Sequence, residues 1–140
     1  MPSKIEGLVA ATYTPLNADG ELNLSQVGPL VEHLLSSGVN GLFVGGSTGE
    51  GMSLTTAERK ELAAEFIQAT SGRVPVMVHV GHNSLTDAAD LAAHAAAAGA
   101  TAVSATCPSY YPIGSVDTLV DSMAQVDSAA EATPFYYYDI

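Results

Sequence analysis

A glycine-rich loop with two adjacent hydroxyl residues carries the strongest chemical signal in the sequence. Residues 45–51 read Gly-Gly-Ser-Thr-Gly-Glu-Gly and directly follow an apolar run at 41–45. Glycines let the backbone turn sharply, and the hydroxyls of Ser47 and Thr48 can join backbone N–H groups in binding a carboxylate or a phosphate. The loop is not a Walker motif, because no lysine follows it at the required spacing. It indicates either an anion-binding loop or a tight strand-to-helix turn capped by the two hydroxyls.

A second group of hydroxyls belongs to tyrosines near the last residue. Tyr136, Tyr137 and Tyr138 end an apolar run, and Asp139 follows them. Alternation along a strand sends Tyr136 and Tyr138 to one side and Tyr137 to the other. A phenol facing a pocket can relay a proton, although its usual pKa of about 10 means that it needs suitable neighbours at neutral pH. The alternative is that all three rings belong to a hydrophobic core.

Two further tyrosines lie in a loop bounded by prolines. Tyr110 and Tyr111 stand between Pro108 and Pro112, and the prolines restrict the backbone that presents the rings. Tyrosine is common both over ligand pockets and at contacts between subunits. The loop therefore indicates either a cover for the site or a contact with another subunit.

The remaining candidates for chemistry are one cysteine and a pair of histidines. Cys107 is the only cysteine, which excludes an intrachain disulfide and a cysteine-based zinc site. With no evident base beside it, we expect a buried and unreactive thiol. His79 and His82 have no evident carboxylate partner, so we expect a hydrogen-bonded structural His79 and a solvated His82 rather than a metal pair. We predict neither a metal site nor a cofactor.

Five strands are expected to position these loops. Five runs of residues are nearly continuous in apolar side chains, as is typical of strands buried on both faces of a parallel sheet. They span residues 8–14, 41–45, 74–80, 101–105 and 134–138. Helical patterns fill the gaps, so strand and helix alternate along the whole chain.

Local signals mark the ends of the first two helices. Asn23 or Ser25 can cap the first helix, and Gly38 stands just past its end, where a left-handed residue is favoured. Residues 55–58 have the sequence of a capping box, in which the first and last side chains each bond to the other's backbone N–H. We expect the second helix to begin there.

The third and fourth helices have similar boundaries. The alanine-rich third helix is predicted over residues 87–98, with Ser84 or Thr86 at its start and Gly99 at its end. The fourth is predicted over residues 115–130, where apolar residues recur with helical periodicity.

Two architectures fit this alternation. A complete flavodoxin-like sheet has five strands, whereas a full (β/α)8 barrel needs about 250 residues, so length favours the open sheet. The position of the motifs favours the barrel, because the loop after the first strand, at 15–20, has no glycine cluster and the unusual loops follow the later strands. We therefore predict an α/β fold in which residues 1–140 form one domain, the N-terminal part of a (β/α)8 TIM barrel that stops after its fifth strand.

The charge balance restricts the partners. Four Lys and Arg residues stand against fifteen Asp and Glu residues, a formal charge of −11, and such a surface repels nucleic acids and anionic membranes. Residues 1–7 lack the pattern of a leader peptide, and no run of about 18 apolar residues occurs. We expect a cytoplasmic protein without nucleic-acid or membrane partners.

Four motifs, in this order and at matching spacing, resemble the superfamily of N-acetylneuraminate lyases and dihydrodipicolinate synthases. They are residues 45–50, 79–81, 108–112 and 135–140. The resemblance runs from Gly7 to the last residue. Ser47 before Thr48 and the ending Phe-Tyr-Tyr-Tyr-Asp-Ile are more similar to the lyases than to the synthases.

The resemblance implies a class I aldolase that binds pyruvate as a Schiff base to a lysine. A lyase of this kind splits N-acetylneuraminate reversibly into N-acetylmannosamine and pyruvate. Ser47 and Thr48 would hold the pyruvate carboxylate, and Ser47 would also join a proton relay. Tyr138 would move a proton to or from the substrate hydroxyl, and Tyr110 of a neighbouring subunit would complete the relay. A homotetramer is implied for the full-length enzyme.

One departure from the superfamily concerns the Schiff-base lysine, which the resemblance implies on a sixth strand. Lys4 and Lys60 are the only lysines, and neither is expected in the barrel centre, so we expect the 140 residues to be inactive alone. One alternative is a dihydrodipicolinate synthase or another 2-keto acid aldolase. Another is a non-catalytic half-barrel that binds a small acid or assembles with a partner.

Overall fold

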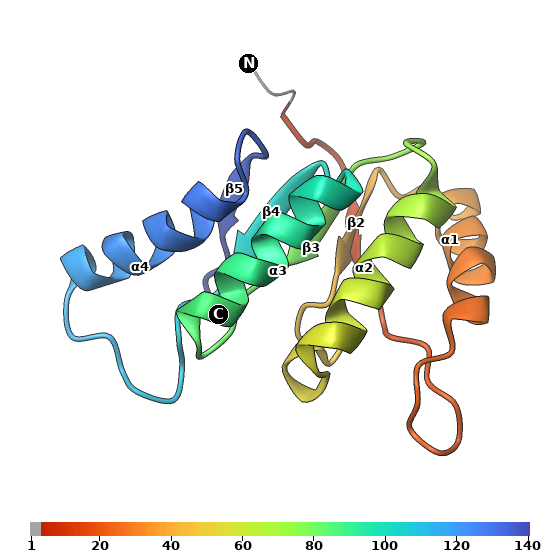
Figure 1. Ribbon diagram of the computed structural model, residues 1–140. Helices are drawn as coiled ribbons and strands as arrows, with labels where there is room; N and C mark the ends of the chain where they lie inside the picture. The colour runs from red at the N-terminus through yellow and green to blue at the C-terminus, as the bar shows by residue number, and fades with distance from the viewer. Residues whose placement is uncertain (1–3) are drawn as a thin grey trace.

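A parallel sheet of five strands forms the framework, and four helices pack on one face of it (Figure 1). The computed structural model describes residues 4–140. The first three residues of the segment 1–7, for which no leader peptide is predicted, lie outside the described residues. The strands are β1 (Val9–Ala11), β2 (Gly41–Val44), β3 (Val76–His79), β4 (Ala102–Ala105) and β5 (Phe135–Tyr137).

The order of the strands decides between the two predicted architectures. The strands lie in the sheet in the order β1-β2-β3-β4-β5, and every neighbouring pair is parallel. A doubly wound sheet would reverse its strand order at a switch point and carry helices on both faces. Sequential order with all helices on one face is the arrangement of a (β/α)8 barrel. The flavodoxin-like alternative is therefore wrong, and the N-terminal part of a TIM barrel is confirmed.

A helix connects each strand to the next. The helices are α1 (Val27–Ser36), α2 (Thr56–Thr70), α3 (Leu85–Ala98) and α4 (Val116–Ala129). Two 3-10 turns, η1 (Leu24–Gln26) and η2 (Gly51–Ser53), precede α1 and α2. Each of the five predicted apolar runs therefore contains one strand, and each predicted helical segment overlaps one helix.

Helix ends that depend on local hydrogen bonds lie where the sequence predicts them. The Thr55 hydroxyl accepts the N–H of Glu58 at 3.2 Å, and the Glu58 carboxylate accepts the N–H of Thr55 at 2.7 Å, which completes the capping box. Gly38 and Gly99 follow α1 and α3 with φ values of +84° and +93°. Glycine adopts this left-handed conformation without the steric cost of a Cβ atom.

Two helix starts differ from the prediction. Neither Asn23 nor Ser25 caps α1, because the Ser25 hydroxyl donates to Asn23 Oδ1 at 2.6 Å and η1 intervenes before the helix. Helix α3 begins at Leu85, two residues before the predicted start. Its cap is Ser84, one of the two predicted candidates, whose hydroxyl accepts the N–H of Asp87 at 3.2 Å.

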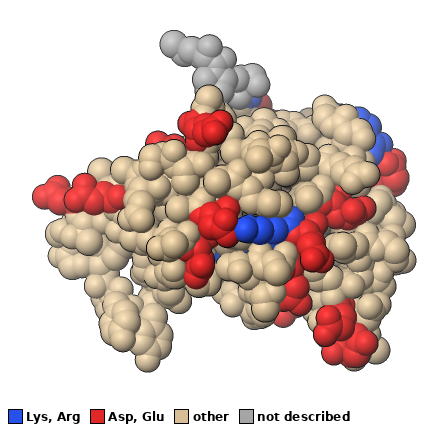
Figure 2. All heavy atoms as spheres, viewed as in Figure 1, with Lys and Arg blue, Asp and Glu red and all other residues tan. Residues whose placement is uncertain are grey.

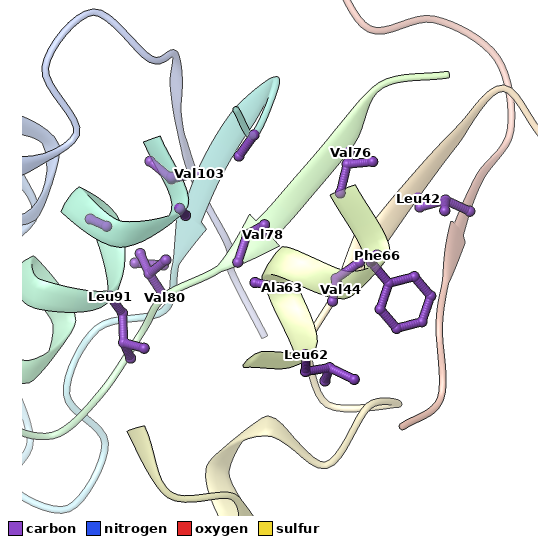
Figure 3. Packing of buried hydrophobic residues seen from close by; sticks show 14 of the residues in the cluster. Leu42, Val44, Leu62, Ala63, Phe66, Val76, Val78, Val80, Leu91 and Val103 are labelled. Atoms are coloured by element: carbon purple, nitrogen blue, oxygen red, sulfur yellow. The ribbon is translucent and has the colours of Figure 1, made fainter. Parts of the chain in front are cut away.

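The hydrophobic core lies between the sheet and the helices (Figure 3). Leu62 and Phe66 of α2 are almost completely buried against alternate residues of the strands, among them Leu42 and Val44. Burial of each such side chain contributes about 1.5–3 kcal/mol relative to exposure. Because successive residues of a strand point to opposite faces, Phe43 faces away from the helices, on what we call the inner face of the sheet.

Acidic side chains are spread over the helical side of the molecule (Figure 2). Two ion pairs join its elements: Lys60 Nζ lies 2.5 Å from Asp90 Oδ2 between α2 and α3, and Arg73 Nη2 lies 2.6 Å from Glu32 Oε1. Surface pairs of this kind contribute only about 0–1 kcal/mol each. Among residues 4–140, every helix is too short or too polar to cross a membrane.

Candidate active site

The candidate site lies at the edge of the sheet where the strands end. The loops after β2, β3 and β4 and the residues after β5 gather along one side of the molecule, at the bottom of Figure 1. This follows from the topology, because the carboxyl ends of parallel strands meet at the same edge. Residues far apart in the sequence are therefore neighbours here.

The loop after β2, residues 45–51, has a backbone that only glycine permits at several positions. A Cβ atom on Gly51 would lie 1.9 Å from the carbonyl oxygen of Gly45, and one on Gly49 would lie 3.0 Å from that of Thr12. Gly45 itself has a φ of +71°. The glycines therefore serve a close turn packed onto the end of β1.

The hydroxyls of this loop are exposed and available to a ligand. The loop is anchored from β1, because the Thr14 hydroxyl donates to the carbonyl oxygen of Gly49 at 2.6 Å. Ser47 and Thr48 are exposed, and their side chains have no hydrogen-bond partner within residues 4–140. A rigid backbone with free hydroxyls suits the predicted binding of an anion. The alternative prediction of a tight turn agrees with this loop, but among residues 4–140 neither hydroxyl caps it.

Tyr138 lies on the inner face, among aromatic neighbours. Its ring packs edge-on against Phe43, with centroids 5.2 Å apart, and against His79, with centroids 5.7 Å apart. Its N–H donates to the carbonyl oxygen of Ala105 at 2.9 Å, which continues the pairing of β5 with β4. Tyr138 also lines a hollow of about 420 Å³ on the inner face. Tyr137 also borders a groove beside α4.

Tyr110 does not join Tyr138 within one chain. It is 77% exposed and packs against Tyr111, with ring centroids 5.0 Å apart. Asn83, in the loop after β3, fixes its backbone: Asn83 Oδ1 accepts the N–H groups of Ser109 at 2.9 Å and of Tyr110 at 3.0 Å. The backbone of the loop is thus held by Asn83, while neither Tyr110 nor Tyr111 lines the hollow.

A buried arginine and histidine lie behind the site. Arg59 of α2 and His79 of β3 are each only 4% exposed. Arg59 donates to the carbonyl oxygens of His79 at 2.8 Å and of Gly81 at 2.9 Å. The His79 ring lies within hydrogen-bond distance of Arg59 Nη2 and of the Thr106 N–H, each at 3.4 Å, so the prediction of a hydrogen-bonded His79 is confirmed.

Burial sets the protonation of both side chains. Burial and, to a lesser extent, the positive charge of Arg59 lower the pKa of His79 to about 4, against a smaller effect of the Gly45 backbone that raises it. Burial also lowers the pKa of Arg59 to about 10. At neutral pH the histidine is therefore uncharged and the arginine is charged.

Two expectations about individual side chains need correction. His82 is not without a carboxylate neighbour, because its Nδ1 lies 3.7 Å from Asp87 Oδ2 and also accepts the N–H of Ser84 at 2.9 Å. Cys107 is half-buried rather than buried, and its hydrogen bond with Tyr137 raises the pKa of that phenol. Among residues 4–140, no group of three or more His, Cys, Asp or Glu side chains could hold a metal ion.

Sequence reasoning missed three residues that shape the site. They are Thr14, Arg59 and Asn83. A signal existed for Arg59, which precedes the predicted inner positions Leu62 and Ala63 by three and four residues and so shares their face of the helix. No local pattern pointed to the partners of the other two, since both act on loops distant in the sequence.

Comparison with known proteins assigns the family. The Dihydrodipicolinate synthetase family matches residues 4–140. The chain belongs to this family. N-acetylneuraminate lyase A from Xenopus laevis is 46% identical over 139 residues, which cover 98% of this chain and 46% of that protein.

Solved structures of family members have the same fold. An N-acetylneuraminate lyase from Proteus mirabilis superposes with a TM-score of 0.95 at 35% identity, over 97% of this chain and 46% of that one. A prophage protein of the dihydrodipicolinic acid synthase family from E. coli K12, in complex with pyruvate, gives a TM-score of 0.91 at 31% identity, over 96% and 44% of the two chains. The chain thus spans about half the length of these relatives.

Proposed function

We propose that this chain provides the pyruvate-binding and proton-transfer part of an N-acetylneuraminate lyase. The reaction would be the reversible aldol cleavage of N-acetylneuraminate into N-acetylmannosamine and pyruvate. The observation that carries the proposal is the position of Tyr138, whose ring lies on the inner face against Phe43 and His79 at the carboxyl ends of the strands. The two relatives that are named as lyases, from Xenopus laevis and Proteus mirabilis, support the choice of reaction.

In this proposal the loop after β2 binds the carboxylate of pyruvate. Ser47 and Thr48 have exposed hydroxyls without partners among the described residues, on a loop whose glycines allow close approach. Hydrogen bonds to a charged carboxylate contribute about 1.5–3 kcal/mol each. Such local donors can hold a small anion in spite of the net charge of −11.

Tyr138 would transfer a proton, and Ser47 would form part of the same relay. The Tyr138 phenol would give a proton to, or take one from, the substrate hydroxyl as the carbon–carbon bond forms or breaks. Tyr110 is exposed and fixed by Asn83, which suits a side chain that reaches into the site of a neighbouring subunit. We propose on this basis a homotetramer for the full-length enzyme, in the cytoplasm.

The amine that forms the Schiff base would come from outside these 140 residues. Lys4 has a side chain that is 83% exposed near the N-terminus, and Lys60 is paired with Asp90 on the helical side. Neither side chain is placed to reach the inner face. The proposed nucleophile is a lysine on a sixth strand.

Two measurements on this chain test the proposal. Titration with pyruvate should shift the NMR signals of Ser47 and Thr48, whereas Ser47→Ala should weaken binding by about tenfold, the effect of losing one hydrogen bond to a carboxylate. Treatment with pyruvate and borohydride should leave the chain unmodified. Absence of binding at these residues, or a reduced adduct on Lys4 or Lys60, would contradict the proposal.

A chimera tests the reaction itself. Residues 1–140 would replace the matching half of the Xenopus laevis lyase, and release of pyruvate from N-acetylneuraminate would be measured. Activity that Tyr138→Phe abolishes is expected. A folded chimera that only condenses pyruvate with an aldehyde substrate of the synthases would favour the dihydrodipicolinate synthase alternative.

A further inference from the structure

His79 lies where three strand ends of the candidate site meet. Its ring packs edge-on against Tyr138 beyond β5, with centroids 5.7 Å apart and planes at 82°. The ring also packs edge-on against Phe43 of β2, with centroids 6.1 Å apart, and a Cβ atom on Gly46 in the following loop would lie 2.4 Å from the Phe43 ring. On the β4 side, the N–H of Thr106 approaches His79 Nε2 at 3.4 Å. One buried side chain therefore contacts the ends of β2, β4 and β5.

The surroundings of the ring fit a neutral imidazole. Two donors face it, the Arg59 guanidinium at 3.4 Å from Nδ1 and the Thr106 N–H at 3.4 Å from Nε2. A neutral ring can accept one of these bonds on its unprotonated nitrogen, whereas a cationic ring would direct an N–H group at both donors. Within residues 4–140, no carboxylate pairs with His79.

Arg59 fixes the strand end that carries His79. Its Nη atoms donate to the carbonyl oxygens of His79 and Gly81, and the planar guanidinium holds both oxygens in one geometry. The backbone then passes close over the ring, since a Cβ atom on Gly81 would lie 2.8 Å from His79 Nε2. His79 is thus restrained at both its backbone and its ring.

We propose that His79, oriented by Arg59, is a positioning residue for the site. Its neutral ring sets the start of the loop that carries Ser47 and Thr48 at a fixed place relative to the Tyr138 phenol. This inference rests on the proposed function of Ser47, Thr48 and Tyr138. It adds His79 and Arg59, which the proposed chemistry does not use. Spacing matters here, because a displacement of about 1 Å at a reacting group can cost about 100-fold in rate.

Variants of His79 in the full chain test this role. His79→Leu removes both ring nitrogens at similar size, His79→Gln keeps one donor and one acceptor, and His33→Leu is the control on the exposed side of α1. We expect His79→Leu to shift the NMR signals of the Tyr138 ring and the Gly45 amide and to weaken pyruvate binding by about tenfold. His79→Gln should restore most of both, and His33→Leu should change neither.

The outcomes separate this inference from the proposed function. Unchanged Tyr138 and Gly45 signals in a folded His79→Leu protein would overturn the positioning role, whatever the pyruvate affinity. A wild-type chain that does not bind pyruvate would contradict the proposed function, while the same two signals would still decide the role of His79. If His79→Leu does not fold, the imidazole ¹⁵N signals of the wild-type protein decide, because a cationic ring at about pH 6 would overturn the inference.

Discussion

Asn83 Oδ1 accepts the backbone N–H of Tyr110 at 3.0 Å, so the loop after β3 holds the loop after β4. The same oxygen accepts the N–H of Ser109 at 2.9 Å. These bonds are exposed, yet they fix the backbone of a tyrosine whose ring has no contact with the sheet hollow. The position of Tyr110 is thus determined by a residue 27 positions earlier.

Replacing Asn83 with Ala should free the loop after β4. Both N–H groups lose their acceptor, so amide hydrogen exchange at Ser109 and Tyr110 should become faster. Chymotrypsin should also cut after Tyr110 sooner than in the wild type. Asn83→Asp keeps a side-chain oxygen acceptor and is the matched control. Equal exchange rates in the two variants would show that the side chain does not hold the loop.

Replacing Arg59 with Met should destabilise the protein by about 2 kcal/mol. The carbonyl oxygens of His79 and Gly81 would lose their donors while buried, and each unsatisfied group costs about 1–3 kcal/mol, partly offset because a buried charge is removed. Arg73→Met is the control, because Arg73 is partly exposed and pairs with Glu32 on the surface. Urea unfolding measures both, and equal losses would contradict a special role for the buried arginine.

Stability should fall between about pH 6.5 and pH 4 because of His79. Its pKa in the folded protein is about 4, below the ordinary value of 6.5, so in this range the unfolded chain binds more protons than the folded one. Stability therefore rises with pH across the window and is lost as pH falls, by about 3 kcal/mol at most. Arg59 is the charged group against the ring, and Tyr138 is the titratable ring beside it.

The His79→Gln variant isolates this effect. Carboxylates such as Glu32 and Glu58, whose pKa values are lowered by hydrogen bonds with Arg73 and Thr55 respectively, lose their contributions at lower pH and are common to both proteins. The difference in unfolding free energy between wild type and variant should therefore change between about pH 6.5 and pH 4. A constant difference would mean that His79 takes up its proton normally in the folded state.

Removing the hydroxyl of Tyr138 should abolish the proposed proton transfer and leave the packing of the ring unchanged. Tyr138→Phe keeps the ring against Phe43 and His79, so the free energy of unfolding should change by less than about 0.5 kcal/mol. Phe43→Ala removes a partly buried ring from the same cluster and should cost about 1–3 kcal/mol. Urea unfolding of the two variants tests the packing, and similar losses would contradict it. Pyruvate binding should survive Tyr138→Phe, since the proposed carboxylate donors are elsewhere.

Much of the fold could be predicted because its signals are local. The capping box of Thr55 and Glu58 spans four consecutive residues, and Gly38 and Gly99 need only their own backbone conformation. Continuous apolar runs predicted the strands for a similar reason. The start of α1 was not predictable in this way, because the side chains of Asn23 and Ser25 form a hydrogen bond with each other rather than with the helix.

In the candidate site, too, some residues could be predicted from the sequence and their surroundings could not. Ser47 and Thr48 stand out in their loop, and Tyr138 stands out at a strand end, so residue types and spacing were enough to name them. Their surroundings were not predictable, since the neighbours of Tyr138 are Phe43 and His79 from two other strands. Pairing of parallel strands alone brings these residues together.

The sequence by itself determined the alternation of strands and helices, the turns that end them and the residues able to do chemistry. Only the tertiary structure decided that the strands follow one another around a barrel, and that Arg59 meets the strand end of His79, 20 residues away. The physical reason is range: caps and turns are satisfied within a few residues, whereas a buried guanidinium finds its acceptors only after helix α2 has packed on the sheet.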